Sequence, residues 1–147
     1  MNELYSNELN EVACNILETI VFAFTEPIDS MPEFESDKFL TAKVPFIGSK
    51  RGHLTMVTTE ELCREWAEMM SSKASETIHL DTLAELANII AGHWLSRHFG
   101  DSELLKLNPP EVSPAESSHW SDLASNPSLV TLTVDGHALI LAAFVQD

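Results

Sequence analysis

Glu85 and Asn88, three residues apart, are the side chains best suited to chemistry in this chain. Residues at this spacing on an α-helix are neighbours on its surface. A carboxylate can pair with a cation on another molecule, whereas a carboxamide can both donate a hydrogen bond to a water molecule and accept one from it. The pair therefore suggests docking of a partner and positioning of water, without a strong nucleophile on this chain.

The helix that carries this pair is predicted to run from about Leu80 to Phe99 and to end at Gly100, a residue type common just after helices. At about 100° per residue, one apolar stripe faces the core. The stripe consists of Leu83, Leu86, Ala87, Ile90 and Trp94. We therefore expect this side of the helix to pack against the rest of the domain.

The opposite side of the helix is expected to face water. It carries Asp81, Glu85, Asn88 and Gly92, with Ile89 beside them. Gly92 removes a side chain one turn beyond Asn88, at a cost of about 1 kcal/mol relative to alanine. A small gap next to an exposed Ile89 suits the close approach of a partner protein. Asp81, Ile89 and Gly92 are thus candidate partner-binding residues, and Glu85 and Asn88 are candidate catalytic residues.

A structural interpretation of the same residues stays open. Thr82 and Glu85 have the spacing of a capping box, in which case the helix would start one turn later. Asn88 would then be an ordinary surface residue, and Gly92 a site of helix packing. The spacing Glu-x-x-Asn is a weak motif by itself, although it occurs only once in the chain.

The remaining segments predict an α+β domain in which helices lie against an antiparallel sheet. A capping box of Thr58 and Glu61 is expected to open the second of the predicted helices. The Asp-Gly pair at 135–136 is a strong signal for a tight hairpin turn. The predicted segments are a helix over 7–24, a loop over 25–38, a hairpin of strands over 41–47 and 53–57, a helix from 58 to about 70, extended chain over 107–114, an uncertain polar stretch over 115–126, and a closing hairpin over 129–134 and 137–145. Residues 1–147 are expected to form a single domain.

The pattern Asp81-x-x-x-Glu85-x-x-Asn88, continued by Ile-Ile-Ala-Gly, resembles the signature helix of the CheC/CheX/FliY phosphatases. Pro109 and Pro110 fall close to a proline that this family has about twenty residues downstream of the motif. The first helix lacks Glu-x-x-Asn, so the chain is most similar to the single-site CheX members. The resemblance implies a CheC-like fold, an antiparallel sheet with long helices packed on one side.

The resemblance also implies a function. Members dephosphorylate a phosphorylated response regulator of the CheY type, in chemotaxis or another two-component pathway. By analogy, Asn88 would orient the attacking water and Glu85 would pair with the regulator's active-site lysine. The regulator would supply Mg²⁺, with no cofactor and no covalent intermediate on this chain. The alternative is a non-catalytic interaction module of the same fold that binds a response regulator or a flagellar or chemoreceptor component.

Composition and motifs argue against other classes of protein. The net charge of −15 would repel nucleic acid and anionic membranes. No apolar run reaches the roughly 18 residues of a membrane span, and the start lacks a signal-peptide pattern, so we expect a cytoplasmic protein. Cys14 and Cys63 are expected to be free thiols. His93 and His98 fall on different helix faces, and no metal or nucleotide motif is present, so we expect no metal site.

The oligomeric state is expected from the resemblance alone, because CheX-like proteins form dimers. The apolar segment Ala138–Val145 could pair across such an interface. A central strand of a monomer would show the same near-continuous apolar run, so the two interpretations of this segment stay open.

Overall fold

The computed structural model describes residues 2–34, 38–70, 77–100 and 104–146. In these residues four helices and seven strands follow one another as helix, three strands, two helices, two strands, helix and two strands. Their bounds are α1 (Asn2–Ile20), β1 (Thr25–Pro27), β2 (Phe39–Gly48), β3 (Arg51–Thr59), α2 (Glu60–Met70), α3 (Ile78–Phe99), β4 (Leu105–Leu107), β5 (Glu111–Pro114), α4 (Ser117–Ala124), β6 (Val130–Val134) and β7 (His137–Gln146).

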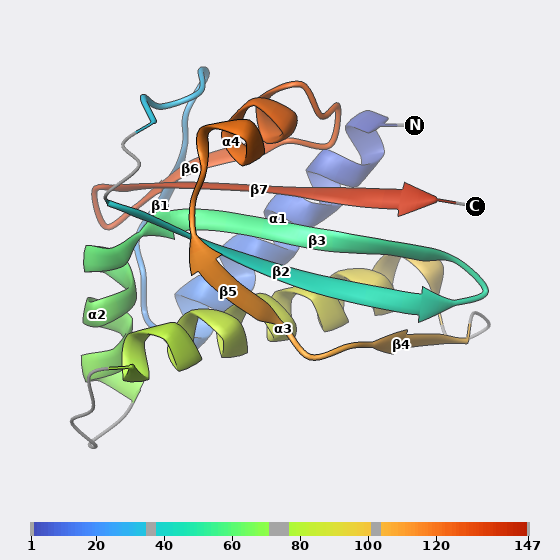
Figure 1. Ribbon diagram of the computed structural model, residues 1–147, viewed down its shortest axis with the longest axis horizontal. Helices are drawn as coiled ribbons and strands as arrows, with labels where there is room; N and C mark the ends of the chain where they lie inside the picture. The colour runs from blue at the N-terminus through green and yellow to red at the C-terminus, as the bar shows by residue number, and fades with distance from the viewer. Residues whose placement is uncertain (1, 35–37, 71–76, 101–103, 147) are drawn as a thin grey trace.

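The seven strands form one antiparallel sheet in the order β1-β6-β7-β3-β2-β4, with β5 also paired to β2 (Figure 1). Strand β7 lies between β6 and β3, and both of its edges are hydrogen-bonded within the chain. Pairing of the whole segment Ala138–Val145 across a dimer interface is therefore wrong as a prediction, because β3 occupies one edge of this strand and β6 occupies the first half of the other. Its apolar run marks a central strand instead.

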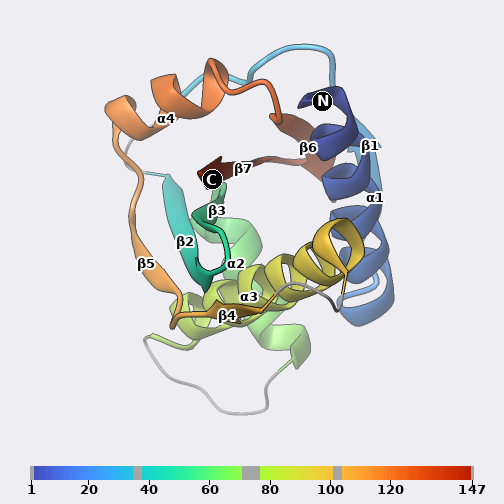
Figure 2. The same cartoon turned by 90° about the vertical axis from the view of Figure 1, so that its right-hand side faces the viewer.

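The three longer helices cover one face of the sheet, and the short helix α4 covers part of the other (Figures 1 and 2). Alternate residues of β2 point to opposite faces of the sheet. Ala42 and Val44 enter the main core, under the three longer helices, whereas Phe39 enters a smaller core on the other face. The smaller core lies under α4 and contains Phe39, Val57, Ala115, Leu123, Ile140 and Ala142. The expected fold, long helices packed on one side of an antiparallel sheet, is confirmed, with α4 as an addition.

The first helix ends four residues earlier than predicted, at Ile20. Phe22 adopts a φ of 53°, the left-handed conformation that ends many helices. The following residues turn back toward the sheet, where the Phe24 N–H donates to Asp135 Oδ1 at 2.9 Å. The short strand β1 then pairs with β6 inside the segment predicted to be a loop. None of the described helices has the length and apolar character needed to cross a bilayer.

The start of α2 is displaced by one residue from the predicted capping box. The Leu62 N–H donates to Thr59 Oγ1 at 3.1 Å, so Thr59 is the cap. Thr58 remains in β3, and its hydroxyl donates to the Ala138 carbonyl at 2.8 Å. The prediction of Thr58 as cap is wrong because the ladder between β3 and β7 extends through this residue.

The predicted turn of the closing hairpin is confirmed. Asp135 and Gly136 have φ values of 49° and 85°, as a two-residue turn with left-handed geometry requires. Val134 and His137 face each other across the turn in β6 and β7. The uncertain stretch over 115–126 contains α4.

Candidate active site

The helix α3 that carries the candidate residues lies across the sheet on the face that it shares with α1 and α2 (Figure 1). It ends as predicted, because Gly100 takes a φ of 73° and its N–H donates to the Ser96 carbonyl. Asp81 lies in its first turn, and Arg97 and His98 lie in its last turn. The charges of Asp81 and Arg97 interact favourably with the helix dipole at the two ends and stabilise the helix.

The predicted apolar stripe of α3 is confirmed. All five of its residues are fully buried, namely Leu83, Leu86, Ala87, Ile90 and Trp94. Thr82 lies one turn inside the helix, and its hydroxyl donates to the Ile78 carbonyl at 2.9 Å. The capping-box interpretation of Thr82 and Glu85 is therefore wrong, because the helix begins upstream of both residues.

Polar contacts fix α3 at both ends. Near its start, His79 Nε2 lies 3.2 Å from Glu60 Oε1 of α2. Near its end, His98 Nδ1 lies 2.6 Å from Glu8 Oε1 of α1. The Trp94 ring stacks on the His98 ring at a centroid distance of 5.3 Å. The helix is thus held on a rigid frame, as a site that must place a side chain accurately requires.

Glu85 and Asn88 lie on the side of α3 that faces away from the core. Glu85 is exposed and Asn88 is half-buried. Within the described residues, neither side chain makes a hydrogen bond or ion pair. Asp81 is exposed one turn before Glu85. A carboxylate and a carboxamide are therefore presented side by side, and their hydrogen-bonding groups are available to a partner.

Ile89 and Gly92 are less open than expected. Ile89 is half-buried and packs against the main core instead of standing exposed. A Cβ atom at Gly92 would lie 3.6 Å from Leu107 Cδ1, so β4 runs beside this part of the helix. Pro109 and Pro110 follow β4 after one residue, Asn108. The sequence gives no sign that Leu107 borders the motif helix, because the contact joins segments fifteen residues apart.

Gly92→Ala is expected to raise the free energy of unfolding by about 0.5–1 kcal/mol, because alanine is the better helix former and the added methyl group makes only an ordinary contact with Leu107. Gly92→Phe should lower it, since a ring has to displace Leu107. Urea denaturation of both variants measures the difference. A destabilised Gly92→Ala would contradict this account of the Gly92 surface.

A second polar cluster joins the start of β7 to α2. The candidate ligand atoms of Glu61, Glu65 and His137 all lie within 4.8 Å of one another. Both nitrogens of the His137 ring are engaged, Nε2 with Glu65 Oε2 at 2.8 Å and Nδ1 with Thr59 Oγ1 at 3.1 Å. We therefore interpret the cluster as a set of contacts that holds β7 against α2. Sequence reasoning missed it because the residues are far apart in the chain.

The two cysteines are free, as expected. Burial raises the pKa of the Cys63 thiol to about 12, with a smaller contribution from the charge of Glu60. A thiol in this state is not a nucleophile near neutral pH. The chemistry of the chain therefore does not rest on Cys63.

Comparisons with known proteins point to one family. The family model of chemotaxis phosphatase CheX matches residues 40–132. No curated protein sequence matches the chain. Among solved structures, CheX of Vibrio vulnificus is 11% identical, with a TM-score of 0.73 and coverage of 99% of both chains. The CheX-CheY-BeF3-Mg complex of Borrelia burgdorferi gives 19% identity, a TM-score of 0.68, and coverage of 97% of this chain and 98% of that chain. FliY of Thermotoga maritima is 16% identical, with a TM-score of 0.56 and coverage of 95% of this chain and 89% of that chain.

Proposed function

Because the chain belongs to the CheX family of chemotaxis phosphatases, we propose that it hydrolyses the aspartyl phosphate of a phosphorylated response regulator of the CheY type. The observation that carries the proposal is the pair Glu85 and Asn88, presented on the outer side of α3 without partners in the described part of the chain. The Borrelia burgdorferi protein, which has a similar fold, was solved in complex with CheY, BeF3 and Mg.

Asn88 is the proposed catalytic residue. An aspartyl phosphate is already an activated group, and the regulator brings the Mg²⁺ that neutralises the phosphoryl oxygens, so this chain needs no cofactor of its own. What remains is to hold a water molecule in line with the P–O bond that breaks, and such positioning can supply several kcal/mol. The Asn88 carboxamide can do this without placing a negative charge beside the phosphoryl group.

Glu85 is proposed to pair with the regulator's active-site lysine and to fix the register of docking. Asp81, Gly92 and the exposed part of Ile89 would form the surrounding contact surface. A carboxylate that pairs with a cation in a closed interface contributes a few kcal/mol when its geometry is good. The exposed position of Glu85 beside Asn88 supports this division of roles.

Glu85→Ala is expected to raise KM for the phosphorylated regulator about tenfold or more, while kcat changes less than about threefold, because the lost contact serves docking more than chemistry. Steady-state assays over a range of regulator concentrations measure both constants. Asp122→Ala is the control, since it removes an exposed acidic side chain from α4 on the other face of the sheet. A fall in kcat at unchanged KM would contradict the docking role.

The assay that tests the function itself uses regulators phosphorylated by a small-molecule phosphodonor, with loss of the acyl phosphate followed over time. Acceleration by the wild-type chain is the expected result. A chain that binds regulators without accelerating hydrolysis would instead be a non-catalytic interaction module of the same fold. That outcome separates the enzyme from the adaptor.

We further propose that residues 1–147 form one domain, that the protein acts in the cytoplasm where response regulators are found, and that it forms a homodimer as CheX-like proteins do. Since β7 is central, a dimer would have to use another surface. Sedimentation velocity measures the assembly directly. A monomer mass at all concentrations would contradict the dimer.

A further inference from the structure

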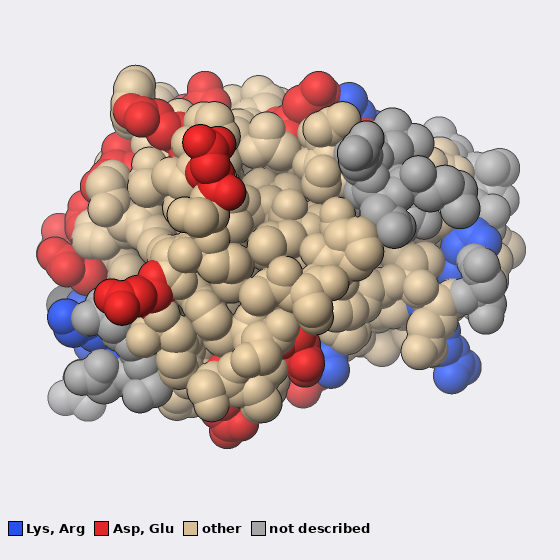
Figure 3. Space-filling view, turned by 90° about the horizontal axis from the view of Figure 1, so that it is seen from above, with Lys and Arg blue, Asp and Glu red and all other residues tan. Residues whose placement is uncertain are grey.

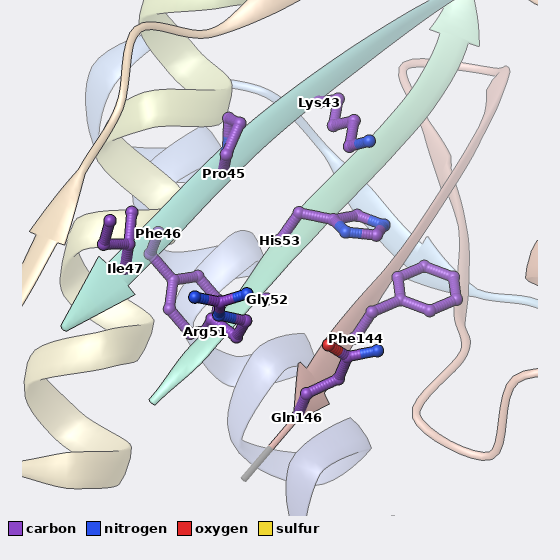
Figure 4. Close-up of a pocket in the computed structure, with 9 residues that line it drawn as sticks. All are labelled: Lys43, Pro45, Phe46, Ile47, Arg51, Gly52, His53, Phe144 and Gln146. Carbon is purple, nitrogen blue, oxygen red and sulfur yellow. The ribbon is translucent and has the colours of Figure 1, made fainter. Parts of the chain in front are cut away.

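A pocket of about 430 Å³ lies on the sheet face away from α1, α2 and α3, beyond the part that α4 covers. We call it the sheet pocket. Its polar lining comes from Lys43 of β2, from Arg51 and His53 of β3, and from Gln146 of β7. Figure 4 shows Lys43 and His53 reaching from neighbouring strands toward the Phe144 ring, which stacks on His53 at a centroid distance of 4.5 Å.

The charge of the sheet pocket is opposite to that of the protein. The chain has 23 acidic against 8 basic residues, and acidic side chains gather on the left half and along the edges of the face in Figure 3, with basic ones at its margins. Two of the eight, Lys43 and Arg51, line the sheet pocket, and none of the described acidic residues does. Neither makes an ion pair with any residue in the described ranges. A concentrated positive charge in so acidic a chain favours the binding of an anion.

The neutral groups of the sheet pocket suit an organic ligand. Burial, and to a lesser extent the charge of Lys43, lowers the pKa of His53 to about 4. The imidazole is therefore neutral at pH 7 and offers one hydrogen-bond donor and one acceptor. Phe144 and Ile47 add apolar surface. A few polar groups set in an apolar lining are typical of small-molecule sites.

The sheet pocket continues toward α4 into a second pocket of about 680 Å³, which shares Lys43, His53 and Phe144 with it. Thr41 lies in this extension with 5% of its surface exposed, and its Oγ1 atom has no hydrogen-bond partner. Unpaired buried hydroxyl groups are rare in proteins, and a ligand can satisfy this one. Glu111, which pairs with Lys43 across β2 and β5, and Asp122 line the extension, so the negative end of a ligand belongs at the Arg51 end of the sheet pocket.

We propose that the sheet pocket binds a small organic carboxylate, with its negative group at the Arg51 end and its apolar body against Phe144. A singly charged group suits this end better than a doubly charged one, because the carboxylates of the extension lie close by and repel added negative charge. The site is separate from the Glu85 and Asn88 surface, which lies on the α3 side of the sheet, and does not depend on the proposed phosphatase activity.

Titration of the ¹⁵N-labelled protein with benzoate, followed by NMR, tests the proposal. Saturable shifts are expected for backbone amides of β2, β3 and β7 near the sheet pocket, with a Kd on the order of millimolar for a ligand of this size. Benzamide, the neutral analogue, should give no saturable shifts there, and phenyl phosphate should bind more weakly than benzoate. Equal binding of benzamide, tighter binding of phenyl phosphate, or no saturation by benzoate would overturn the assignment.

Variants show whether the two cations are responsible. Lys43→Met and Arg51→Gln together should weaken benzoate binding at least about tenfold, because they remove the positive charge of the sheet pocket. Lys106→Met, at an exposed lysine of β4 outside the pocket, removes one positive charge elsewhere and should leave the Kd unchanged. Both substituted side chains are exposed, so the fold should persist. The proposal would be overturned if Lys106→Met weakened benzoate binding as much as the double variant does. It would also be overturned if the wild-type protein self-associated and the double variant abolished that self-association.

Discussion

Asn88→Ala is expected to lower kcat for hydrolysis of the phosphorylated regulator by at least about 100-fold, a loss of about 2.7 kcal/mol of transition-state stabilisation. Water held by the regulator alone would attack from many orientations, and the carboxamide selects the one in line with the scissile bond. Since Asn88 makes no side-chain hydrogen bond within the described residues, its removal should not alter the fold. Thermal unfolding of the variant checks this point.

Two further variants make the Asn88 result specific. Asn15→Ala removes a carboxamide from an exposed position of α1 and should leave kcat unchanged. Asn88→Asp keeps the size of the side chain but adds a negative charge, and it should be as slow as Asn88→Ala or slower. An active wild type together with an equally active Asn88→Ala would show that the phosphatase works by another mechanism.

Trp94→Ala is expected to lower the free energy of unfolding by about 3–5 kcal/mol, the usual range for truncating a buried aromatic residue. Trp94 is fully buried, and its ring stacks on His98 and meets Phe99 edge-on at a centroid distance of 5.9 Å. Truncation would leave a cavity where α3 packs against the sheet and loosen the end of the helix that Glu8 holds. Urea denaturation gives the value directly.

His93→Ala is the control for Trp94→Ala, because His93 is the residue before Trp94 and is exposed. Its substitution should change the free energy of unfolding by no more than about 0.5 kcal/mol. At a temperature where Trp94→Ala remains folded, its kcat should stay close to that of the wild type, since Trp94 lies on the opposite side of α3 from Asn88. A loss of less than 1 kcal/mol would mean that Trp94 is not a core residue.

Local periodicity explains why the motif helix was predictable. Apolar residues repeat along α3 at the helical spacing, so the buried stripe and the outward direction of Glu85 and Asn88 follow from the sequence. The Asp135-Gly136 turn was predictable for a similar reason, because its residue types allow a rare backbone geometry. Both features are set by neighbours within a few residues.

The features that the sequence did not reveal depend on distant segments. Thr58 belongs to a strand because β7, about eighty residues later, pairs with β3 as far as this residue. Ile89 is half-buried because it packs against the main core, which the helical pattern alone does not specify at the edge of a stripe. The sheet pocket joins side chains of β2, β3 and β7, and only the register between these strands brings them together.

The central place of β7 sets the order in which the protein can form during synthesis. Strands β3 and β6 share no hydrogen bonds with each other and meet only through residues 137–146. On the ribosome, the hairpin of β2 and β3 and the pair of β6 and β1 therefore cannot join into one sheet until this last strand emerges. Contacts between segments so far apart in the chain also slow folding, and a nascent chain stopped before His137 would expose the inner edges of both parts to chaperones and proteases.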